Sequence, residues 1–282
     1  MKIVVTGVKG QLGYDVVREL KSRGYQDVIG IDIEDLDITN QYAVIDFFKA
    51  NNPNIIIHCA AYTSVDRAED NKELCMNVNV NGTKYLVEQA KKYDSKFIFI
   101  STDYVFDGEK ELSYEVNDQP NPQSVYGESK YLGELETLKY DKHFIVRISW
   151  VFGKNGSNFV KTMLKLGKEK EFLNVVNDQF GSPTYTYDLS RLLVDLIKTN
   201  KYGIYHGTNE GTCSWYEFTK EIFTLANIAI PVYPIFTSDY PTKAKRPKNS
   251  VMSKSSLDEN RFKRLPCWKD ALKRYLQEIE VI

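Results

Sequence analysis

Cysteine is scarce in this chain, and the four that occur lie far apart. Cys59, Cys75, Cys213 and Cys267 show neither the paired spacing of a metal site nor the density of a disulfide-rich secreted domain. We therefore expect free thiols in a reducing compartment. The sequence also lacks any apolar run near the roughly 20 residues that a bilayer-spanning helix needs, so we expect no membrane partner.

The N-terminus lacks the order of segments that marks a secretory signal. The chain enters an apolar strand pattern at Lys2–Val5, with no basic region, apolar stretch and cleavage site in succession. We therefore expect a cytoplasmic protein. An excess of one charge is also missing, because 37 Lys and Arg oppose 38 Asp and Glu. This balance argues against a nucleic-acid partner.

The first half of the chain is rich in short apolar runs that alternate with helical patterns. Continuous Ile and Val strands alternating with helices predict an α/β protein with a doubly wound parallel sheet, the Rossmann fold. Strands are expected at Ile3–Thr6, Val28–Asp32, Ile55–Cys59, Phe97–Ser101 and Phe144–Ser149. Helices are expected at Leu12–Leu20, Tyr42–Ala50, Leu74–Tyr93 and Ser124–Leu138.

The pattern loosens after Trp150. Helical patterns at Phe159–Leu166 and Leu189–Ile197 are separated by loops rich in Gly, Pro and Asn. We expect a nucleotide-binding Rossmann domain at residues 1–150. We expect residues 151–282 to supply the remainder of the sheet and a smaller C-terminal lobe that binds the substrate.

Three glycines lie between the first predicted strand and the first predicted helix. Gly7, Gly10 and Gly13 let the backbone approach a pyrophosphate, which also meets the free N–H groups of the helix N-terminus. The spacing alone is also compatible with a tight turn that binds nothing. A cofactor is favoured by Asp32 at the end of the second strand, where a carboxylate accepts hydrogen bonds from the adenosine ribose. That carboxylate suits NADH, whereas NADPH needs a compensating cation such as Lys9.

Tyr126 and Lys130 are four residues apart in a helical pattern, so both side chains face the same side of the helix. A nearby ammonium stabilises phenolate, and we expect it to lower the tyrosine pKa and so favour proton exchange. The pair alone is also compatible with a solvated helix face. Support comes from Thr102 and Asp103 at the end of the fourth strand, where parallel sheets bind their ligands. Thr102 and Asp103 could instead cap a turn.

Taken together, these motifs resemble the extended short-chain dehydrogenase/reductases, and within them the dTDP-4-dehydrorhamnose reductase family. The resemblance runs along nearly the whole chain in family order. The matching stretches are Gly7–Gly13, Leu36–Thr39, Ala60–Asp66, Asn77–Asn79, Ser101–Phe106, Tyr126–Lys130, Arg147–Gly153, Asn177–Thr184 and Arg246–Ser250.

The resemblance implies reduction of the 4-keto group of dTDP-4-dehydrorhamnose to dTDP-L-rhamnose, with NADH or NADPH as the cofactor. Thr102, Tyr126 and Lys130 are then the catalytic residues. The expected cofactor-binding residues are Gly7, Gly10, Gln11, Leu12, Gly13, Asp32, Asp37, Ile38, Ala61, Tyr62, Thr63, Tyr126 and Lys130. The expected substrate-binding residues are Thr102, Asp103, Tyr126, Trp150 and Arg246, the last in a basic loop suited to a diphosphate.

The resemblance also raises the questions of a metal and of a partner subunit. The family has been associated with a magnesium site at a dimer interface. Asp15 could supply one ligand, but the sequence offers no full set, so we expect no metal. A homodimer is an open expectation.

Three alternative functions share the fold. A nucleotide-sugar dehydratase typically has Asp-Glu after the threonine, whereas Tyr104 follows Asp103 here. A nucleotide-sugar epimerase would show no net consumption of NADH. A non-catalytic subunit, like the regulatory subunit of methionine adenosyltransferase, would have no turnover, although this chain keeps the catalytic residue types.

Overall fold

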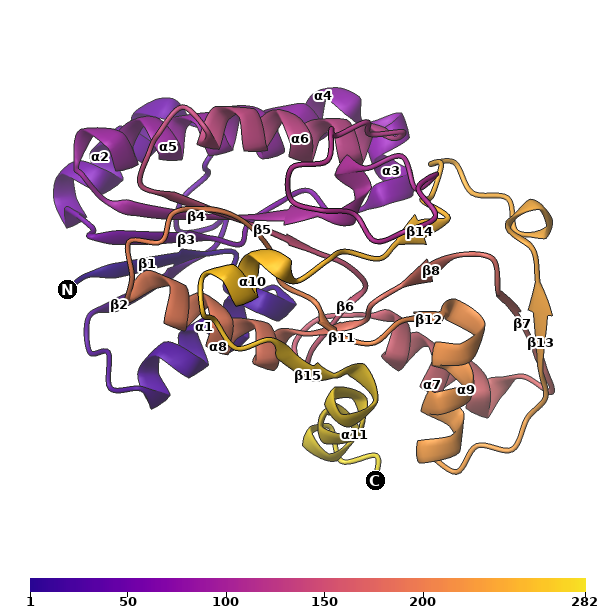
Figure 1. Cartoon of the computed structure of the whole chain (residues 1–282). Coiled ribbons are helices and arrows are strands. Elements are labelled where there is room, and N and C mark those ends of the chain that lie inside the picture. The colour runs from indigo at the N-terminus through magenta and orange to yellow at the C-terminus, as the bar shows by residue number, and fades with distance from the viewer.

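Six short strands form a parallel sheet at the centre of the molecule, in the order β10-β5-β4-β3-β1-β2 (Figure 1). The computed structural model describes all residues from 1 to 282. The strands of this sheet are β1 (Ile3–Thr6), β2 (Val28–Ile31), β3 (Ile55–His58), β4 (Lys96–Thr102), β5 (His143–Ile148) and β10 (Gly203–His206). The first five agree with the predicted strands to within a residue at each end, and β10 is the expected later addition to the sheet.

Helices cover both faces of the sheet, because successive side chains of each strand point to opposite faces. Ile3 and Val5 of β1 pack into the core beneath α1 (Gln11–Ser22) and α8 (Thr186–Ile197). Val4 points the other way, into the core beneath α2 (Gln41–Asn51) and α5 (Thr83–Lys92). Helix α6 (Val125–Thr137) lies beside α5 on that second face (Figure 1). The predicted doubly wound fold is confirmed.

The predicted helix Leu74–Tyr93 is helical throughout but not uniform. It consists of α4 (Lys72–Met76), one π-helical segment η1 (Asn77–Gly82) and α5. In a π-helical segment each backbone hydrogen bond spans one residue more than in an α-helix. Such segments occur often at functional sites. The short helix α3 (Val65–Asp70) precedes α4.

A smaller lobe follows β5 and contains its own apolar core. Its helices are α7 (Phe159–Glu169), α9 (Trp215–Leu225) and α11 (Trp268–Glu278) (Figure 1). Phe152 belongs to this core and contacts the rings of Phe218 and Tyr275. Short strand pairs and one three-stranded sheet surround these helices. They are β6 (Val151–Phe152), β7 (Leu173–Val176), β8 (Phe180–Gly181), β9 (Thr184–Tyr185), β11 (Asn209–Glu210), β12 (Cys213–Ser214), β13 (Val232–Ile235), β14 (Asn249–Ser250) and β15 (Leu265–Cys267).

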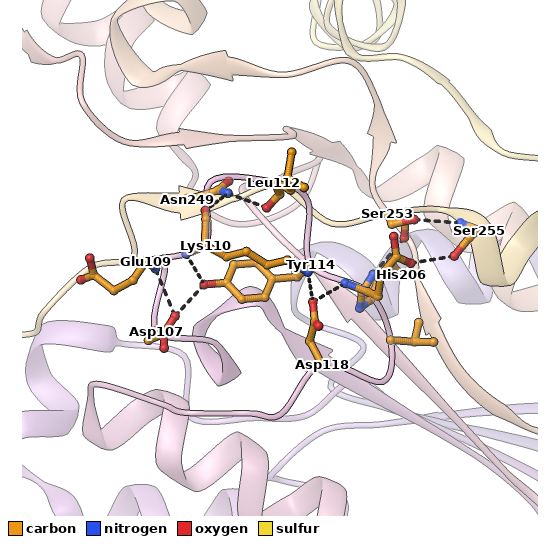
Figure 2. Close-up of polar contacts among 12 residues, drawn as sticks. Asp107, Glu109, Lys110, Leu112, Tyr114, Asp118, His206, Asn249, Ser253 and Ser255 are labelled. Carbon is orange, nitrogen blue, oxygen red and sulfur yellow. Dashed lines mark hydrogen bonds and ion pairs between the residues drawn. The ribbon is translucent and has the colours of Figure 1, made fainter.

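The loop of residues 107–118, between β4 and α6, is held against the segment that contains β14 (Figure 2). Asn249 Nδ2 donates to the carbonyls of Lys110 and Leu112, and the Tyr114 N–H donates to the carbonyl of Val251. The Tyr114 hydroxyl donates to Asp107 Oδ1 at 2.6 Å. The remaining short helices are η2 (Asp103–Val105), η3 (Thr237–Asp239) and α10 (Ser255–Glu259).

None of the helices combines the length and the apolar character that a bilayer crossing requires. The sheet draws one strand from beyond residue 150, as the sequence led us to expect, and the division into domains at that residue stays a prediction.

Candidate active site

A cavity of about 680 Å³ opens at the carboxyl ends of β1, β3, β4 and β5. This is where open parallel sheets bind ligands, beside the point at which the chain crosses from one side of β1 to the other. Every predicted site residue except Arg246 lines this cavity. They are Gly7, Gly10, Gln11, Leu12, Gly13, Asp32, Asp37, Ile38, Ala61, Tyr62, Thr63, Thr102, Asp103, Tyr126, Lys130 and Trp150.

The glycine turn has no room for larger residues. Gly7 has φ +69°, and a Cβ there would lie 2.7 Å from the Ala60 nitrogen. A Cβ on Gly13 would lie 2.3 Å from the Gly7 carbonyl oxygen. Helix α1 starts directly after Gly10 with no side-chain cap, so its first N–H groups face the cavity without a partner from the turn. These features fit the pyrophosphate of a dinucleotide.

Asp32 follows β2 and lines the cavity, but part of its hydrogen-bonding capacity is already used. Its Oδ2 accepts from the Lys9 N–H at 2.8 Å, and its Oδ1 accepts from the Ile33 N–H at 2.9 Å. The carboxylate therefore tethers the glycine turn. The Lys9 ammonium instead pairs with Glu34 at 2.8 Å, and both of these side chains are largely exposed.

Tyr126 lies in the first turn of α6, which Ser124 caps by accepting from the Gly127 N–H. Its ring makes an edge contact with Tyr104, with 5.5 Å between the centroids. Burial raises the pKa of Tyr126 above its usual value, while the neighbouring Thr102 hydroxyl opposes the rise. The phenol is protonated at neutral pH even at its ordinary pKa, and burial makes that proton harder to remove.

Lys130 lies one turn further along α6 and is buried. Its ammonium sits 4.0 Å from the centroid of the Phe99 ring. Burial lowers the pKa of Lys130 to about 7, and the nearby Glu134 carboxylate opposes the fall. The expected lowering of the tyrosine pKa by this ammonium is not seen, because burial dominates both groups.

Asp103 is buried beside Thr102, whose hydroxyl donates to Oδ1 of Asp103 at 2.9 Å. Burial raises the pKa of Asp103 to about 6. Its Oδ2 has no hydrogen-bond partner, although it is buried at the cavity wall. A buried oxygen without a partner suits a ligand hydroxyl.

Trp150 has φ +50°, a conformation that non-glycine residues adopt infrequently. Its indole stacks on Trp215 of the smaller lobe, with 3.6 Å between the ring centroids. One face of the cavity is therefore formed by a residue that the smaller lobe holds in place.

Arg246 lies outside the cavity lining, on a loop of the C-terminal segment. Its guanidinium donates to Asp66 Oδ2 at 2.6 Å and to the Tyr104 hydroxyl at 3.2 Å. Asp66 also accepts from the Ala244 N–H at 3.1 Å. Tyr104 lines the cavity, so Arg246 reaches the cavity wall only through its hydrogen bond to Tyr104. Contact between Arg246 and the substrate stays a prediction.

Several cavity residues were not predicted. Thr6, Cys59 and Ala60 flank the glycine turn, and Tyr104 and Ser149 follow β4 and β5. Their positions directly after buried strands were the available signal. No group of three or more His, Cys, Asp or Glu side chains is arranged so that it could hold a metal ion.

A glycine turn that faces a Tyr-x-x-x-Lys helix across one cavity of a parallel sheet is the arrangement of the short-chain dehydrogenase/reductases. The family model described as RmlD substrate binding domain matches residues 1–281 of this chain. The chain therefore belongs to the RmlD family, and several of its curated relatives are named dTDP-4-dehydrorhamnose reductase.

Individual relatives are similar over their full length. The reductase of Aggregatibacter actinomycetemcomitans is 43% identical, over 96% of this chain and 97% of its own. The spore coat polysaccharide biosynthesis protein SpsK of Bacillus subtilis is 40% identical, over 98% of this chain and 97% of its own. A Bacillus anthracis dTDP-4-dehydrorhamnose reductase, solved in complex with NADP, is 43% identical with a TM-score of 0.96, over 99% of this chain and 100% of that one.

A more distant solved structure shows how widely the fold is shared. The UDP-glucose 4-epimerase of Thermus thermophilus, in complex with NAD, has a TM-score of 0.84 at 19% identity, over 99% of each chain. At that identity the likeness concerns the fold alone.

Proposed function

We propose that this protein reduces the 4-keto group of dTDP-4-dehydrorhamnose to give dTDP-L-rhamnose, with NADPH or NADH as the hydride donor. The observation that carries the proposal is one cavity that joins the glycine turn to Thr102, Tyr126 and Lys130. The family of the chain and the NADP complex of its Bacillus anthracis relative support the substrate and the cofactor.

When bound, the cofactor supplies a hydride from nicotinamide C4 to the ketone carbon. Negative charge develops on the ketone oxygen, and Tyr126 donates its phenolic proton to that oxygen. The Thr102 hydroxyl, which donates to Asp103 Oδ1 in the unliganded cavity, turns its proton to the same ketone oxygen and stabilises its charge. The Lys130 ammonium holds the nicotinamide ribose and adds positive charge beside the phenol as its proton leaves.

The other predicted residues position the two ligands. The first N–H groups of α1 hold the pyrophosphate, and Asp32, Asp37, Ile38 and Ala61–Thr63 surround the adenosine part. Asp103 Oδ2 accepts from a sugar hydroxyl, Trp150 contacts the sugar, and Arg246 meets a phosphate with paired hydrogen bonds. A cytoplasmic location and a homodimer remain predictions.

The direct test is consumption of NADPH, followed by its absorbance, with freshly generated dTDP-4-dehydrorhamnose. We expect turnover with this substrate and much slower turnover with GDP- and UDP-linked keto sugars. Product should be identified by mass, because reduction adds two hydrogens whereas epimerisation adds none. Absence of net NADPH consumption would favour an epimerase or a non-catalytic subunit.

A further inference from the structure

A chain of buried hydrogen bonds runs through His58, at the end of β3. The imidazole is 2% exposed and lies beside the rings of Phe97 and Phe99, with 5.9 Å between its centroid and that of each ring. Its Nδ1 is 2.8 Å from the Thr6 hydroxyl, and its Nε2 is 3.2 Å from the Thr83 hydroxyl. His58 itself does not line the cavity and has no part in the chemistry proposed above.

The direction of each hydrogen bond follows from the groups at the two ends. The Thr83 hydroxyl donates its proton to the Asn79 carbonyl at 2.7 Å, so its oxygen accepts from His58 Nε2–H. His58 Nδ1 then carries no proton and accepts from the Thr6 hydroxyl. The Thr6 oxygen in turn accepts from the Ala60 N–H at 3.0 Å. One neutral tautomer of His58, protonated at Nε2, therefore satisfies every donor and acceptor in this series of hydrogen bonds.

The chain of hydrogen bonds connects the two sides of the cavity. Thr6 and Ala60 lie at the glycine turn on one side. On the other, the π-helical segment directs the Asn79 side chain to the Tyr62 N–H at 2.8 Å and to the Tyr62 carbonyl at 3.1 Å. The same amide donates to Ser129 Oγ at 2.8 Å, next to Lys130 on α6. The polar contacts thus connect Ala60 and Tyr62, which both line the cavity, and reach Ser129 on α6.

We propose that neutral His58, protonated at Nε2, is a positioning residue that fixes the glycine turn relative to the π-helical segment and helix α6. Its Nδ1 holds Thr6 and, through Ala60, the turn that receives the pyrophosphate. Its Nε2 holds Thr83 and Asn79, and through Asn79 the Tyr62 backbone and Ser129. This inference rests on the proposed function of the cavity for the effects on catalysis, but the tautomer does not depend on that function. Burial lowers the pKa of His58 to about 3, which agrees with a neutral ring.

The tautomer is measured directly by long-range ¹H–¹⁵N correlation NMR of the wild-type protein at neutral pH. The chain has three histidines, and His206 serves as an internal reference. His206 Nδ1 faces the Ser253 carbonyl at 2.9 Å (Figure 2), so that ring must be protonated at Nδ1. We expect opposite tautomers for the two buried rings, with His58→Asn assigning the His58 signals. A His58 ring protonated at Nδ1, or at both nitrogens, would overturn the proposal.

Two variants distinguish the role of His58 Nδ1 from that of His58 Nε2. The Asn side chain places an acceptor near Nδ1, whereas Gln places a donor near Nε2. We expect His58→Gln to raise KM for NADPH about fivefold with little change in kcat, because the bond to Thr6 is lost. His58→Asn should lower kcat by a similar factor and leave KM for NADPH near that of the wild type. His58→Leu should show both effects.

The control is His143→Gln, at the opposite end of the sheet, which should change neither constant. Thermal melts of all variants give the loss of stability separately. A purely structural role would lower the melting temperature and move kcat and KM together in both variants, and that result would overturn the proposal. An inactive wild type with the expected tautomers would instead count against the proposed function.

Discussion

The two sides of the active site are built in different ways. On the sheet side, Thr102, Tyr126 and Lys130 are buried or nearly so and belong to a long strand and a capped helix. On the C-terminal side, Arg246 stands on a loop and is held by part-exposed contacts with Asp66 and Tyr104. Regular elements hold the groups proposed for the chemistry, whereas an ion pair between a loop and α3 holds the group proposed for substrate recognition.

This difference has a consequence for binding. The Lys243–Asp70 pair and the Arg246–Asp66 pair join the same loop to α3, and both are largely or partly exposed to solvent. Exposed ion pairs contribute little to stability, so a diphosphate can compete for the arginine at small cost. The buried pair Arg147–Glu134 beside the sheet has no such freedom.

The sheet side should show the largest effect of a single substitution. Tyr126→Phe keeps the ring and removes the proton, so kcat should fall about a hundred- to ten-thousand-fold. NADPH binding, measured by fluorescence titration, and the thermal melt should stay close to those of the wild type. Retention of most of the kcat would contradict the assignment of Tyr126 as the proton donor.

The pH dependence tests the other buried group of the sheet side. Because burial lowers the pKa of Lys130 to about 7, the free enzyme loses the required ammonium as pH rises through that value. We expect kcat/KM for NADPH to be highest below about pH 7 and to fall by roughly tenfold per pH unit above it. Lys130→Arg keeps its charge, so its slower reaction should not show this fall. A wild-type profile that is flat up to pH 10 would show that the ammonium is not required.

Arg246→Ala tests the C-terminal side. A lost pair of charge-assisted hydrogen bonds should raise KM for the sugar nucleotide about tenfold or more and leave KM for NADPH unchanged. The matched control is Arg264→Ala, which removes a similarly exposed arginine that pairs with Asp258 and Glu210 instead. Equal effects of the two variants on substrate KM would remove Arg246 from the site.

The smallest effect is expected at the exposed edge of the cofactor site. To bind the 2′-phosphate of NADPH, the Lys9 ammonium would have to leave its ion pair with Glu34. Both side chains of that pair are solvated. Lys9→Ala should lower kcat/KM for NADPH about two- to fivefold without changing that for NADH. Glu34→Gln should act in the opposite direction, because it frees the ammonium. Matched changes with NADH and NADPH would show that Lys9 does not meet the 2′-phosphate.

The sequence predicted most of the sheet side, because local pattern determines it. Buried runs such as Ile55–His58 give the strands, and the rule that ligands bind at carboxyl ends of parallel strands places Thr102 in the cavity. The pattern could not show that Asn77–Gly82 is π-helical, since its apolar spacing does not differ enough from that of an α-helix.

Tertiary contacts account for what the sequence could not predict. Arg246 and Asp66 are 180 positions apart, so only the folded chain brings them together. The burial that raises the pKa of Tyr126 likewise comes from the folded chain, and the expected lowering of that pKa by Lys130 is not found beside it. His58 gave no signal, because one polar residue at the end of a buried strand is common.

The central claim, direct hydride transfer to sugar C4 in this cavity, is tested by isotope transfer. Wild-type protein is given NADPH that carries deuterium on the transferred C4 position, together with dTDP-4-dehydrorhamnose, and the product is analysed by NMR and mass spectrometry. We predict one deuterium per product molecule, located at C4 of the rhamnose, and none in a reaction without protein. Product without deuterium at C4, or recovery of an unreduced keto sugar, would contradict the account.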